Sequence, residues 1–267
     1  MKSVKKAALA GAGGTGRMSL ARMPALLRHL GPVKSSSYRV ARRLTNALRH
    51  GHAVRDYSEF ADCQAIWITG SEKWVGGAAA ADLAASIALR GKIVILADAW
   101  CDSRSSSALC AAGAYSASLN AVEETRERLF IAEGHPEALR YVRSVLSAER
   151  RKLIEIEPAS KVLYFAGVQF GANLILASIA GAVEALRAAG FSRQDATLLA
   201  QAMGARALRG YGRGGRRAWN VAKTAELDRA IHRELPVLRA KDSNLAKLYE
   251  NGIARARAFF EADSLQP

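Results

Sequence analysis

The chain has 267 residues, of which 50% are hydrophobic and 24% are charged, a globular composition that excludes a disordered chain. This length is enough for two domains, or for one large domain, with a sizeable hydrophobic core. The formal net charge of +15 favours phosphate groups on a cofactor, an acidic substrate or nucleic acid, unless it only solvates the surface.

The first 157 residues alternate short β-rich runs with helical patterns, which predicts a doubly wound parallel sheet. The predicted strands cover residues 7–10, 33–37, 65–69, 92–97, 114–119, 129–133 and 153–156. Helices are predicted between them, among others at residues 38–50, 77–90 and 136–148.

After Pro158 the β signals stop and only helical patterns follow. These helices are predicted at residues 159–189, 192–209, 223–239 and 243–262. Ser192 and Asp195 are spaced as a cap for the second of them. We therefore predict an α/β protein in two domains, a sheet domain at 1–157 and an all-α domain at 158–267.

The first predicted strand runs into Gly11-Ala12-Gly13-Gly14-Thr15-Gly16, which matches the G-x-G-x-x-G pattern of dinucleotide-binding βαβ units. Gly11 would make the tight turn, Gly13 would let the backbone approach a pyrophosphate, and Gly16 would let the helix pack on the strand. The pyrophosphate would bind the free N–H groups of the helix N-terminus. Gly11, Gly13, Thr15 and Gly16 are therefore predicted cofactor-binding residues of a Rossmann domain, with a structural turn as the alternative.

The end of the second predicted strand indicates which dinucleotide the domain binds. NAD enzymes place an Asp or Glu there for the ribose hydroxyls, but the first acidic residue of this chain is Asp56. Hydroxyl and guanidinium groups occupy the region instead, at Ser35, Ser36, Ser37, Arg39, Arg42 and Arg43. Because arginine binds phosphate bidentately, NADP is predicted over NAD, with Ser36, Ser37, Arg39 and Arg43 binding its 2'-phosphate. The alternative is that the arginines only cover an exposed helix face.

The predicted strand at 65–69 runs into a loop at the carboxyl edge of the sheet, where ligands bind in such folds. Thr69, Gly70 and Ser71 are predicted to line the nicotinamide side of the cofactor site. An ordinary strand-to-helix turn is nearly as consistent with the sequence.

With these motifs the chain resembles the cytoplasmic NADP-dependent reductases related to pyrroline-5-carboxylate reductase and to the hydroxyacid and 6-phosphogluconate dehydrogenases. It is most similar to a Rossmann-like branch that has its own helical C-terminal domain. The resemblance covers nearly the whole length, through the order of AGAGGTGRM, SSSYRVARRL, ADCQAIWITG, GKIVIL, GAYSASL, RLFIAEGHPEAL, KVLYFAGVQFGANL and EALRAAGFS. It implies an NADP-binding Rossmann domain, a homodimer built on the helix at 159–189, and hydride transfer at the cleft between the domains.

The chain departs from these relatives at residues that carry the chemistry. Hydroxyacid dehydrogenases have Lys and Asn four residues apart on the first C-terminal helix, where this chain has Gln169 and Asn173. Lys161 and Asn173 are about 18 Å apart along a helix axis and a third of a turn out of phase, so they cannot serve one atom on a straight helix. This favours imine reduction, since a protonated C=N needs positioning more than a strong acid.

Lys161, Gln169 and Asn173 are the predicted catalytic residues. Gln169 and Asn173 would orient the substrate, and Lys161 or Tyr164 would supply a proton. The alternatives are hydrogen bonds between helices in a dimer for the two amides and a surface position for Lys161. The predicted reaction is the NADPH-dependent reduction of a small, preferably carboxylated, imine or ketone. A catalytically inactive NADP-binding sensor or scaffold and a nonspecific nucleic-acid binder are the alternative functions.

Residues 206–223 contain six basic residues and no acidic one, with Tyr211 and Trp219 between them. The stretch is predicted to include a Gly/Arg-rich loop at 209–217, either a clamp for an anionic substrate or cofactor or a mobile solvated loop. Because one short loop is not a basic stripe across a face, nucleic acid is disfavoured as the natural partner.

Cys63, Cys101 and Cys110 form no CxxC pair and leave an odd cysteine over, which favours the reducing cytoplasm and no disulfide framework. The scattered histidines and cysteines predict no metal site. The most apolar segment, residues 165–183, is interrupted by polar residues and glycines, so no membrane-spanning helix is predicted.

Overall fold

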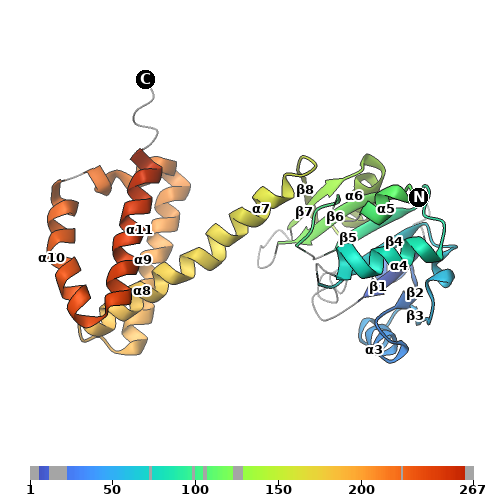
Figure 1. The fold of residues 1–267 in the computed structure, drawn as a ribbon, viewed down its shortest axis with the longest axis horizontal. Coiled ribbons are helices and arrows are strands. Elements are labelled where there is room, and N and C mark those ends of the chain that lie inside the picture. The colour runs from blue at the N-terminus through green and yellow to red at the C-terminus, as the bar shows by residue number, and fades with distance from the viewer. Residues whose placement is uncertain are drawn as a thin grey trace, which may run out of the picture. The chain divides into compact units, whose positions relative to one another are not determined.

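The computed structural model describes residues 6–11, 23–71, 74–97, 100–104, 107–122, 129–223 and 225–261. The chain divides into two compact units, Met1–Ala166 and Gly167–Pro267, both drawn in Figure 1. The predicted domain boundary at 157/158 lies after the last strand, whereas the division between the compact units falls within the long helix that follows.

Eight strands form one sheet within the described part of the first unit, in the order β3-β2-β1-β4-β5-β6-β7-β8. They are β1 (Ala7–Gly11), β2 (Leu30–Lys34), β3 (His52–Ala53), β4 (Ala65–Thr69), β5 (Ile93–Ala97), β6 (Tyr115–Ala121), β7 (Leu129–Gly134) and β8 (Lys152–Glu155). Each predicted strand overlaps an observed one, and β3 was not predicted. The predicted α/β fold with a doubly wound sheet is therefore confirmed.

One pair of strands departs from the predicted parallel arrangement. Strands β6 and β7 are antiparallel, while every other neighbouring pair is parallel. Only residues 122–128 connect these two strands, and a parallel crossover needs about a dozen residues or more. The short connection therefore turns β7 and β8 against the other six strands.

Both faces of the sheet are buried under helices. The helical elements of this unit are α2 (Pro24–Leu27), α3 (Tyr38–Leu48), η1 (Tyr57–Phe60), η2 (Trp74–Ala78), α4 (Ala79–Ser86), α5 (Ser107–Ala111) and α6 (Pro136–Ala148). Along β4, Trp67 joins a cluster with α2 and α6, whereas its neighbours Ile66 and Ile68 join a second cluster with η1, α4 and α5. Parallel strands covered on both faces are nearly continuous hydrophobic runs for this reason.

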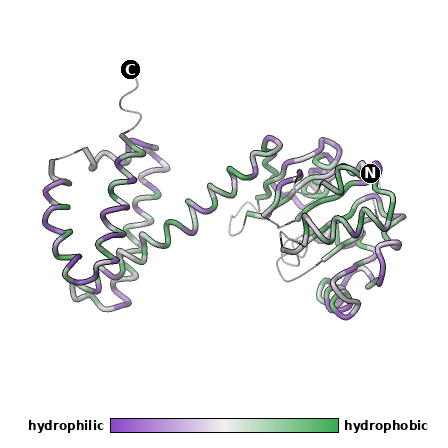
Figure 2. The backbone as a smooth tube through the Cα atoms, viewed as in Figure 1, coloured by the Kyte–Doolittle hydropathy of each residue, from purple (hydrophilic) through white to green (hydrophobic). Residues whose placement is uncertain are grey.

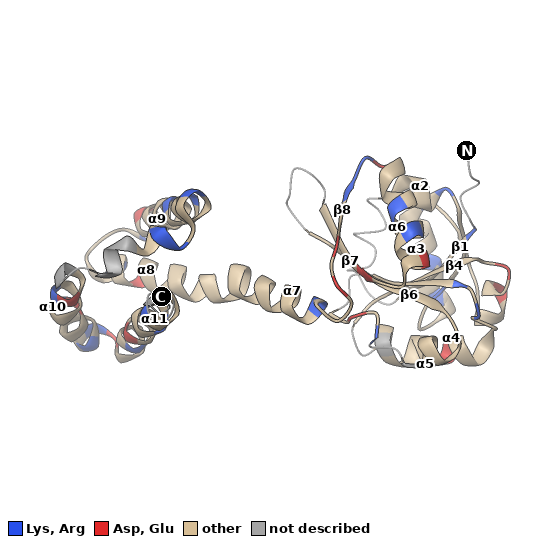
Figure 3. Cartoon of the chain, turned by 90° about the horizontal axis from the view of Figure 1, so that it is seen from above, with Lys and Arg blue, Asp and Glu red and all other residues tan. Residues whose placement is uncertain are grey.

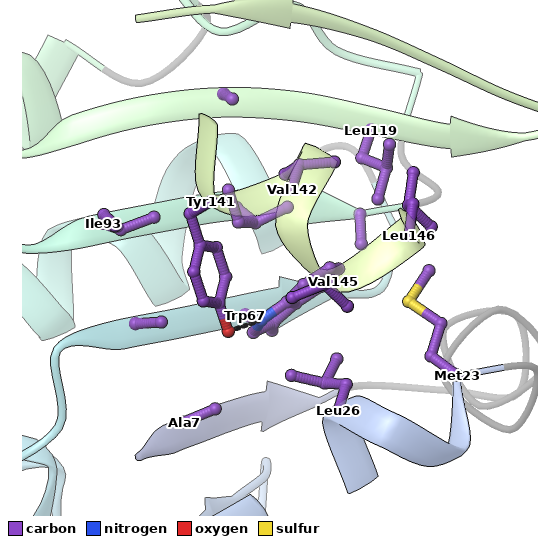
Figure 4. Packing of buried hydrophobic residues seen from close by; sticks show 14 of the residues in the cluster. Ala7, Met23, Leu26, Trp67, Ile93, Leu119, Tyr141, Val142, Val145 and Leu146 are labelled. Atoms are coloured by element: carbon purple, nitrogen blue, oxygen red, sulfur yellow. Dashed lines mark hydrogen bonds between the residues drawn. The ribbon is translucent and has the colours of Figure 1, made fainter. Parts of the chain in front are cut away.

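The cluster under α6 contains one polar contact (Figure 4). The indole Nε1 of Trp67 donates a hydrogen bond to the Tyr141 hydroxyl over 3.4 Å. Burial raises the pKa of Tyr141 to about 12, and the hydrogen bond from Trp67 opposes this shift only in part. The phenol therefore stays protonated and remains a neutral partner in the core at ordinary pH.

The second unit is wholly helical in its described residues, which confirms the predicted all-α region. The long helix α7 (Lys161–Val168), η3 (Gln169–Leu174) and α8 (Ile175–Ala188) leads into α9 (Arg193–Gly214), η4 (Gly215–Lys223), α10 (Ala225–Lys241) and α11 (Ser243–Glu261). Helix α8 packs against α9 and α11, and α10 packs against α11. Ser192 Oγ accepts a hydrogen bond from the Asp195 backbone N–H over 3.1 Å, so the predicted cap of α9 is confirmed.

The basic stretch at 206–223 is helical, so the predicted loop at 209–217 was wrong. Helix α9 continues through Gly210 and Gly212 to Gly214, and the 3-10 segment η4 follows directly. Gly215 ends α9 with φ +52°, a conformation that glycine adopts without steric cost. A glycine inside a helix costs only about 1 kcal/mol, so these residues do not by themselves stop it.

The helix Lys161–Ala188 is long and apolar enough to cross a membrane by length and composition, with a mean hydropathy of 1.7 over its most apolar 18-residue window. Figure 2 shows the hydrophobic colouring along it. Only 6% of that window is buried. One such helix is weak evidence of a membrane span, and the expectation of no membrane-spanning helix stays a prediction.

A buried carboxylate, Glu133 on β7, fixes the backbone that leads into α7. Its side chain is fully buried, and its two oxygens accept hydrogen bonds from the backbone N–H groups of Ser103 over 2.6 Å and Ala159 over 2.7 Å. Ala159 has φ +72°, a left-handed conformation that costs a non-glycine residue about 1–2 kcal/mol. The carboxylate therefore holds a strained turn in place directly before α7.

We expect Glu133→Gln to lower the free energy of unfolding by about 1.5–3 kcal/mol, because an amide cannot accept from both backbone donors. Urea unfolding followed by circular dichroism measures the change. Glu137→Gln is the matched control, since Glu137 forms only an exposed ion pair with Arg140 and should change stability by less than about 1 kcal/mol. Equal stability of Glu133→Gln and the native chain would contradict this role.

Candidate functional site

The carboxyl ends of β1, β2 and β4 meet where the winding of the sheet reverses. Strand β1 pairs with β2 on one side and with β4 on the other, and open α/β sheets bind ligands at such a switch point. Gly11 pairs with Thr69, and Ser35 Oγ donates a hydrogen bond to the Gly11 carbonyl. The switch point of this sheet is therefore formed by Gly11, Ser35 and Thr69.

Gly11 is in close contact with the helix that follows β2. A Cβ atom at this position would lie 2.6 Å from Leu44 Cδ2 and 3.5 Å from Thr69 Oγ1, so α3 packs directly on the end of β1. A larger residue would require the Leu44 side chain to move. The predicted residues Gly13, Thr15 and Gly16 lie outside the described residues.

The loop after β4 continues this edge. Thr69 is buried, and Gly70 has φ +152°. The Ser71 carbonyl accepts hydrogen bonds from the N–H groups of Trp74 and Val75 over 3.0 and 2.9 Å. These bonds begin the π-helical segment η2, and π-helical turns are frequent at functional sites. Thr69, Gly70 and Ser71 thus form a strand-to-helix turn beside Gly11. This geometry is compatible with both predictions made for these residues, a lining of the nicotinamide side and an ordinary turn.

An arginine-rich hollow lies beside the first turns of α3. It has a volume of about 370 Å³ and is lined by Tyr38, Arg39, Arg42, Arg43 and Asn46. We call these five residues the arginine hollow. They include three guanidinium groups and no carboxylate. Arginine groups of this kind bind phosphate through charge-assisted hydrogen bonds.

The predicted serines lie at the start of the same helix. Strand β2 begins and ends earlier than predicted, so Ser36 and Ser37 follow it as exposed residues. Ser37 Oγ accepts a hydrogen bond from the Val40 N–H over 3.3 Å and caps α3. The N-terminus of α3 adds a positive partial charge to this region. Sequence reasoning missed Tyr38 and Asn46, although their spacing from the arginines along one helix places them on the same surface.

A second hollow of about 490 Å³ lies at the end of β2 and contains acidic groups. Lys34 and the carboxylates Asp56 and Asp82 line it, together with Tyr57 and Ser58. Lys34 Nζ lies 4.5 Å from the centre of the Tyr57 ring. Burial, with a smaller contribution from Asp82, raises the pKa of Tyr57 to about 12. The mixed charge of this second hollow suits a neutral polar group better than a phosphate.

The structure brings two predicted catalytic residues together in the second unit. Asn173 Nδ2 donates a hydrogen bond to Gln169 Oε1, and both residues belong to the π-helical segment η3. Asn173 is exposed and Gln169 is half-buried. The pair has a second donor on Gln169 and an acceptor on Asn173, so it can bind one donor group and one acceptor group of a ligand.

Lys161 lies in the first unit, and its side chain is fully buried. The alternative of a surface position for Lys161 was therefore wrong. Its Nζ donates a hydrogen bond to Ser118 Oγ, which donates to the Cys101 carbonyl over 2.7 Å. The ring of Phe165, one turn later, stacks on Trp100 with centroids 4.8 Å apart. Lys161 thus connects the start of α7 to β6 and to the segment after β5.

Arg216 and Trp219 of the basic stretch contact aromatic rings of α11. The Trp219 ring stacks on Phe260 with centroids 5.1 Å apart. The Arg216 guanidinium lies 4.6 Å from the centre of the Phe259 ring and donates a hydrogen bond to the Phe259 carbonyl. Trp219 is therefore not an exposed surface for stacking with nucleic-acid bases, whereas Tyr211 is 54% exposed.

The three cysteines are free thiols, with Cys63 and Cys101 buried and Cys110 exposed. Burial raises the pKa of the Cys63 thiol, which lowers its thiolate fraction at neutral pH. Among the residues that the structure describes, His, Cys, Asp and Glu form no group of three or more that could hold a metal ion.

The comparisons with known proteins support the fold. Residues 128–213, which include Lys161, Gln169 and Asn173, match a family described as a domain of unknown function, DUF2520. A search of curated protein sequences finds no match.

Three solved structures illustrate the likeness over almost the whole chain. A reductive aminase from Aspergillus terreus in complex with NADPH and ethyl-5-oxohexanoate is 18% identical, with 95% of this chain and 94% of that chain covered and a TM-score of 0.68. An imine reductase from Myxococcus stipitatus in complex with NADP+ is 14% identical, with coverages of 94% and 93% and a TM-score of 0.68. A pyrroline-5-carboxylate reductase from Coxiella burnetii is 13% identical, with coverages of 96% and 98% and a TM-score of 0.55.

At these identities the likeness establishes a shared fold, a Rossmann-like sheet followed by a helical region. This is the fold that the sequence resemblance implies, and the prediction is confirmed at that level.

Proposed function

We propose that this chain is an NADPH-dependent oxidoreductase that reduces a small imine or ketone, preferably a carboxylated one. The observation that carries the proposal is the arginine hollow on α3, the helix that follows β2, which contains three guanidinium groups and no carboxylate. The shared fold with enzymes crystallised with NADPH or NADP+ supports it.

The residues present fit a dinucleotide with a 2'-phosphate. A pyrophosphate needs a close approach to the backbone at the end of β1, where Gly11 has no side chain to obstruct it. The adenosine ribose would lie at the end of β2, where Ser36 and Ser37 offer hydroxyls and Arg39 and Arg43 offer positive charge. A 2'-hydroxyl without phosphate would leave these guanidinium groups without an anion.

The chemistry that bound NADPH supplies is hydride transfer to the carbon of a C=N or C=O bond. Thr69, Gly70 and Ser71 would line the side of the site where that carbon is held. Gln169 and Asn173 would orient the substrate through the donor and the acceptor of the amide pair. A protonated imine already carries its activating charge, so positioning by neutral amides suffices, whereas a ketone also needs a proton donor.

The prediction that Lys161 supplies this proton is not tested by the structure. Its full burial and its bond to Ser118 favour a positioning role, in which Lys161 holds the start of α7. The two roles differ in one measurable way, because loss of a proton donor changes the pH profile of turnover and loss of an anchor lowers stability.

The first prediction concerns the cofactor. We expect the chain to bind NADPH at least about tenfold more tightly than NADH, because only NADPH carries an anion for the arginine hollow. Arg39→Ala and Arg43→Ala should each weaken NADPH about three- to tenfold and leave NADH unchanged, as expected for exposed charge pairs. Isothermal titration calorimetry measures both affinities, and exposed Arg90→Ala serves as control. Equal affinities for NADPH and NADH would contradict the assignment.

The second prediction concerns the reaction. We expect NADPH absorbance to fall with a member of a panel of cyclic imines and 2-oxo acids. Asn173→Ala and Gln169→Ala should lower kcat about 100-fold with NADPH affinity intact, since misplacing a substrate by about 1 Å costs that much. Asn251→Ala, on α11, is the matched amide control. A loss of stability without a loss of kcat would show that the amides are structural.

Lys161→Ala completes this series. If only 2-hydroxy acids are turned over and Lys161→Ala abolishes the activity with unchanged stability, hydroxyacid oxidation replaces imine reduction as the function.

An NADP-binding sensor or scaffold without catalysis is the second candidate function. The observation that favours it is the burial of Lys161 together with an amide, Gln169, where the resembling dehydrogenases have lysine. Tight NADPH binding with no turnover across the panel would support this candidate. Nucleic acid is a weaker candidate, because Trp219 and Arg216 of the basic stretch are engaged with Phe259 and Phe260.

The apolar helix Lys161–Ala188 supports a homodimer as the working form of the protein. Figure 3 shows that the helix is almost free of charged residues. Large apolar side chains are exposed along it, with Leu163 at 74%, Phe170 at 70% and Leu176 at 62%. Monomeric soluble proteins rarely expose a contiguous patch of this kind. A second copy would cover it with an equivalent helix, as in most symmetric dimers.

We expect multi-angle light scattering to give the mass of a dimer at micromolar concentration. Phe170→Asp and Leu176→Asp should each weaken the dimer at least about tenfold by placing a charge in an apolar interface. Ile154→Asp, at an exposed position of β8, is the control. A monomer with undiminished stability, or a chain that floats with lipid vesicles, would rule out the homodimer as the cover of this helix.

A further inference from the structure

The second hollow, beside the last residue of β2, is lined by none of the residues assigned to reduction. It has a volume of about 490 Å³, and its lining includes Lys34 of β2, Asp56 and Tyr57 at the start of η1, and Asp82 and Ala85 of α4. Pockets that bind small molecules have volumes of about 300–1,000 Å³. The charged side chains of this hollow decide which molecule suits it.

The second hollow and the arginine hollow are built from helices on opposite faces of the sheet. Tyr57 belongs to the hydrophobic cluster that η1 and α4 form on one face, whereas Leu48 of α3 belongs to the cluster on the other face. The two hollows share no lining residue. A ligand of the second hollow is therefore expected to bind beside NADPH and not in its place.

The three charged side chains of the second hollow, Lys34, Asp56 and Asp82, are not paired with one another. Among the residues that the structure describes, none of the three forms an ion pair, and neither carboxylate accepts a hydrogen bond. Asp56 occupies the N-cap position of η1 but makes no side-chain cap bond. Lys34 Nζ lies over the Tyr57 ring, 4.5 Å from its centre. One cationic and two anionic groups are thus available to a ligand.

The Tyr57 hydroxyl is a further polar group of this hollow. Tyr57 is only 4% exposed, and its hydroxyl has no hydrogen-bond partner within the described ranges. Burial, with a smaller contribution from the charge of Asp82, raises the pKa of Tyr57 to about 12, so the phenol stays protonated and can donate.

This hydroxyl is accessible from the hollow that Tyr57 lines. In the described part of the chain, the polar atoms that lack both solvent contact and a partner do not include the Tyr57 oxygen. A ligand in the hollow can therefore reach it. Polar groups of buried residues are nearly always hydrogen-bonded, so a free donor at this position indicates an acceptor on a bound molecule.

The balance of charges selects the class of ligand. A phosphate or a simple carboxylic acid would be repelled by Asp56 and Asp82, and a simple amine would leave Lys34 without an anion. A molecule that carries an ammonium group and a carboxylate on one carbon atom offers a partner to all three side chains. This arrangement of charges is that of a free α-amino acid.

We propose that the second hollow binds a free α-amino acid. Its carboxylate accepts hydrogen bonds from Lys34 Nζ and Tyr57 Oη, and its ammonium group donates to the carboxylates of Asp56 and Asp82. The proposal goes beyond the reductase function, and it is tested without NADPH and without turnover. A failure of one proposal therefore leaves the other intact.

L-leucine is the probe, titrated calorimetrically into the full chain. Its analogues 3-methylbutylamine and 4-methylpentanoate keep the side chain, but the first lacks the carboxylate and the second lacks the ammonium group. We expect one L-leucine per chain and at least about tenfold weaker binding of each analogue, because each loses the hydrogen bonds of one charged group.

Substitutions in the lining separate the two charges of the ligand. Lys34→Gln and Asp82→Asn should each weaken L-leucine about three- to tenfold, as expected for charge pairs open to solvent. Asp82→Asn should also weaken 3-methylbutylamine and leave 4-methylpentanoate unchanged, and Lys34→Gln should do the reverse. A purely structural role of these residues would not produce this exchange. Glu59→Gln, at an exposed position of η1 outside the lining, is the matched control.

Two further variants test the hydroxyl and the space. Tyr57→Phe keeps the ring that packs edge to face on Phe60 and should weaken L-leucine about fivefold through the loss of one hydrogen bond. Ala85→Phe, at an exposed position of the lining, should fill the hollow and abolish binding. Ala111→Phe, at an exposed position of α5 outside the lining, should bind as the native chain does.

Any of four results would overturn the proposal. The first is a native chain that does not bind L-leucine, and the second is equal binding of L-leucine and either analogue. The third is undiminished binding by Ala85→Phe, which would place the probe elsewhere. The fourth is mutual exclusion of L-leucine and NADPH, which would make the second hollow part of the cofactor site. We expect saturating NADPH to change the affinity for L-leucine less than about twofold, because the two hollows share no residue.

Discussion

The close packing of α3 on the end of β1 is the constraint on which the candidate cofactor site depends. Gly11 has no side chain, and a Cβ atom there would overlap Leu44. The same strand end is paired with β4 at Thr69 and bonded to Ser35 beyond β2. These contacts join the end of β1 to Leu44 of α3, to Ser35 and to Thr69 at one edge of the sheet. A larger residue at position 11 would require the Leu44 side chain to move.

The start of α7 shows how the fold limits the chemistry. Glu133 holds the strained turn at Ala159, and Lys161 is buried against Ser118. Burying an ammonium group is costly unless it is hydrogen-bonded, so these bonds stabilise the lysine in its place. Both charged groups thus hold the start of α7, and the amides of Gln169 and Asn173 follow as polar groups on the apolar helix. Neutral amides orient a substrate well but move no proton, which is why the proposed reaction is one in which the substrate carries its own activating charge.

The sequence predicts those elements of the fold that have a local cause. The strands at β4 and β5 are continuous apolar runs because both faces are buried, and Ser192 marks the start of α9 because its side chain caps the helix. Strand β3 has no such signal, because two residues contain no periodicity. The direction of β7 depends on the length of its connection to β6. At the candidate site, the sequence predicts the arginines after β2 as phosphate-binding residues because no acidic residue stands beside them in the chain. The burial of Lys161 depends on Ser118, which is 43 residues away, and local patterns carry no information about such contacts.

The positive charge of the chain has a different structural meaning in its two units. In the first unit no acidic residue precedes Asp56, so the guanidinium groups of α3 lie exposed around a hollow, where an anion can bind without a competing carboxylate. In the second unit the guanidinium group of Arg216 lies against the aromatic rings of α11. Arg216 remains exposed to solvent there, so its guanidinium group contacts the aromatic faces from outside. The arginines of α3 are thus grouped around a hollow that suits a phosphate, whereas Arg216 is engaged with the rings of its own unit. A net charge alone does not distinguish these two roles, whereas the environment of each guanidinium group does.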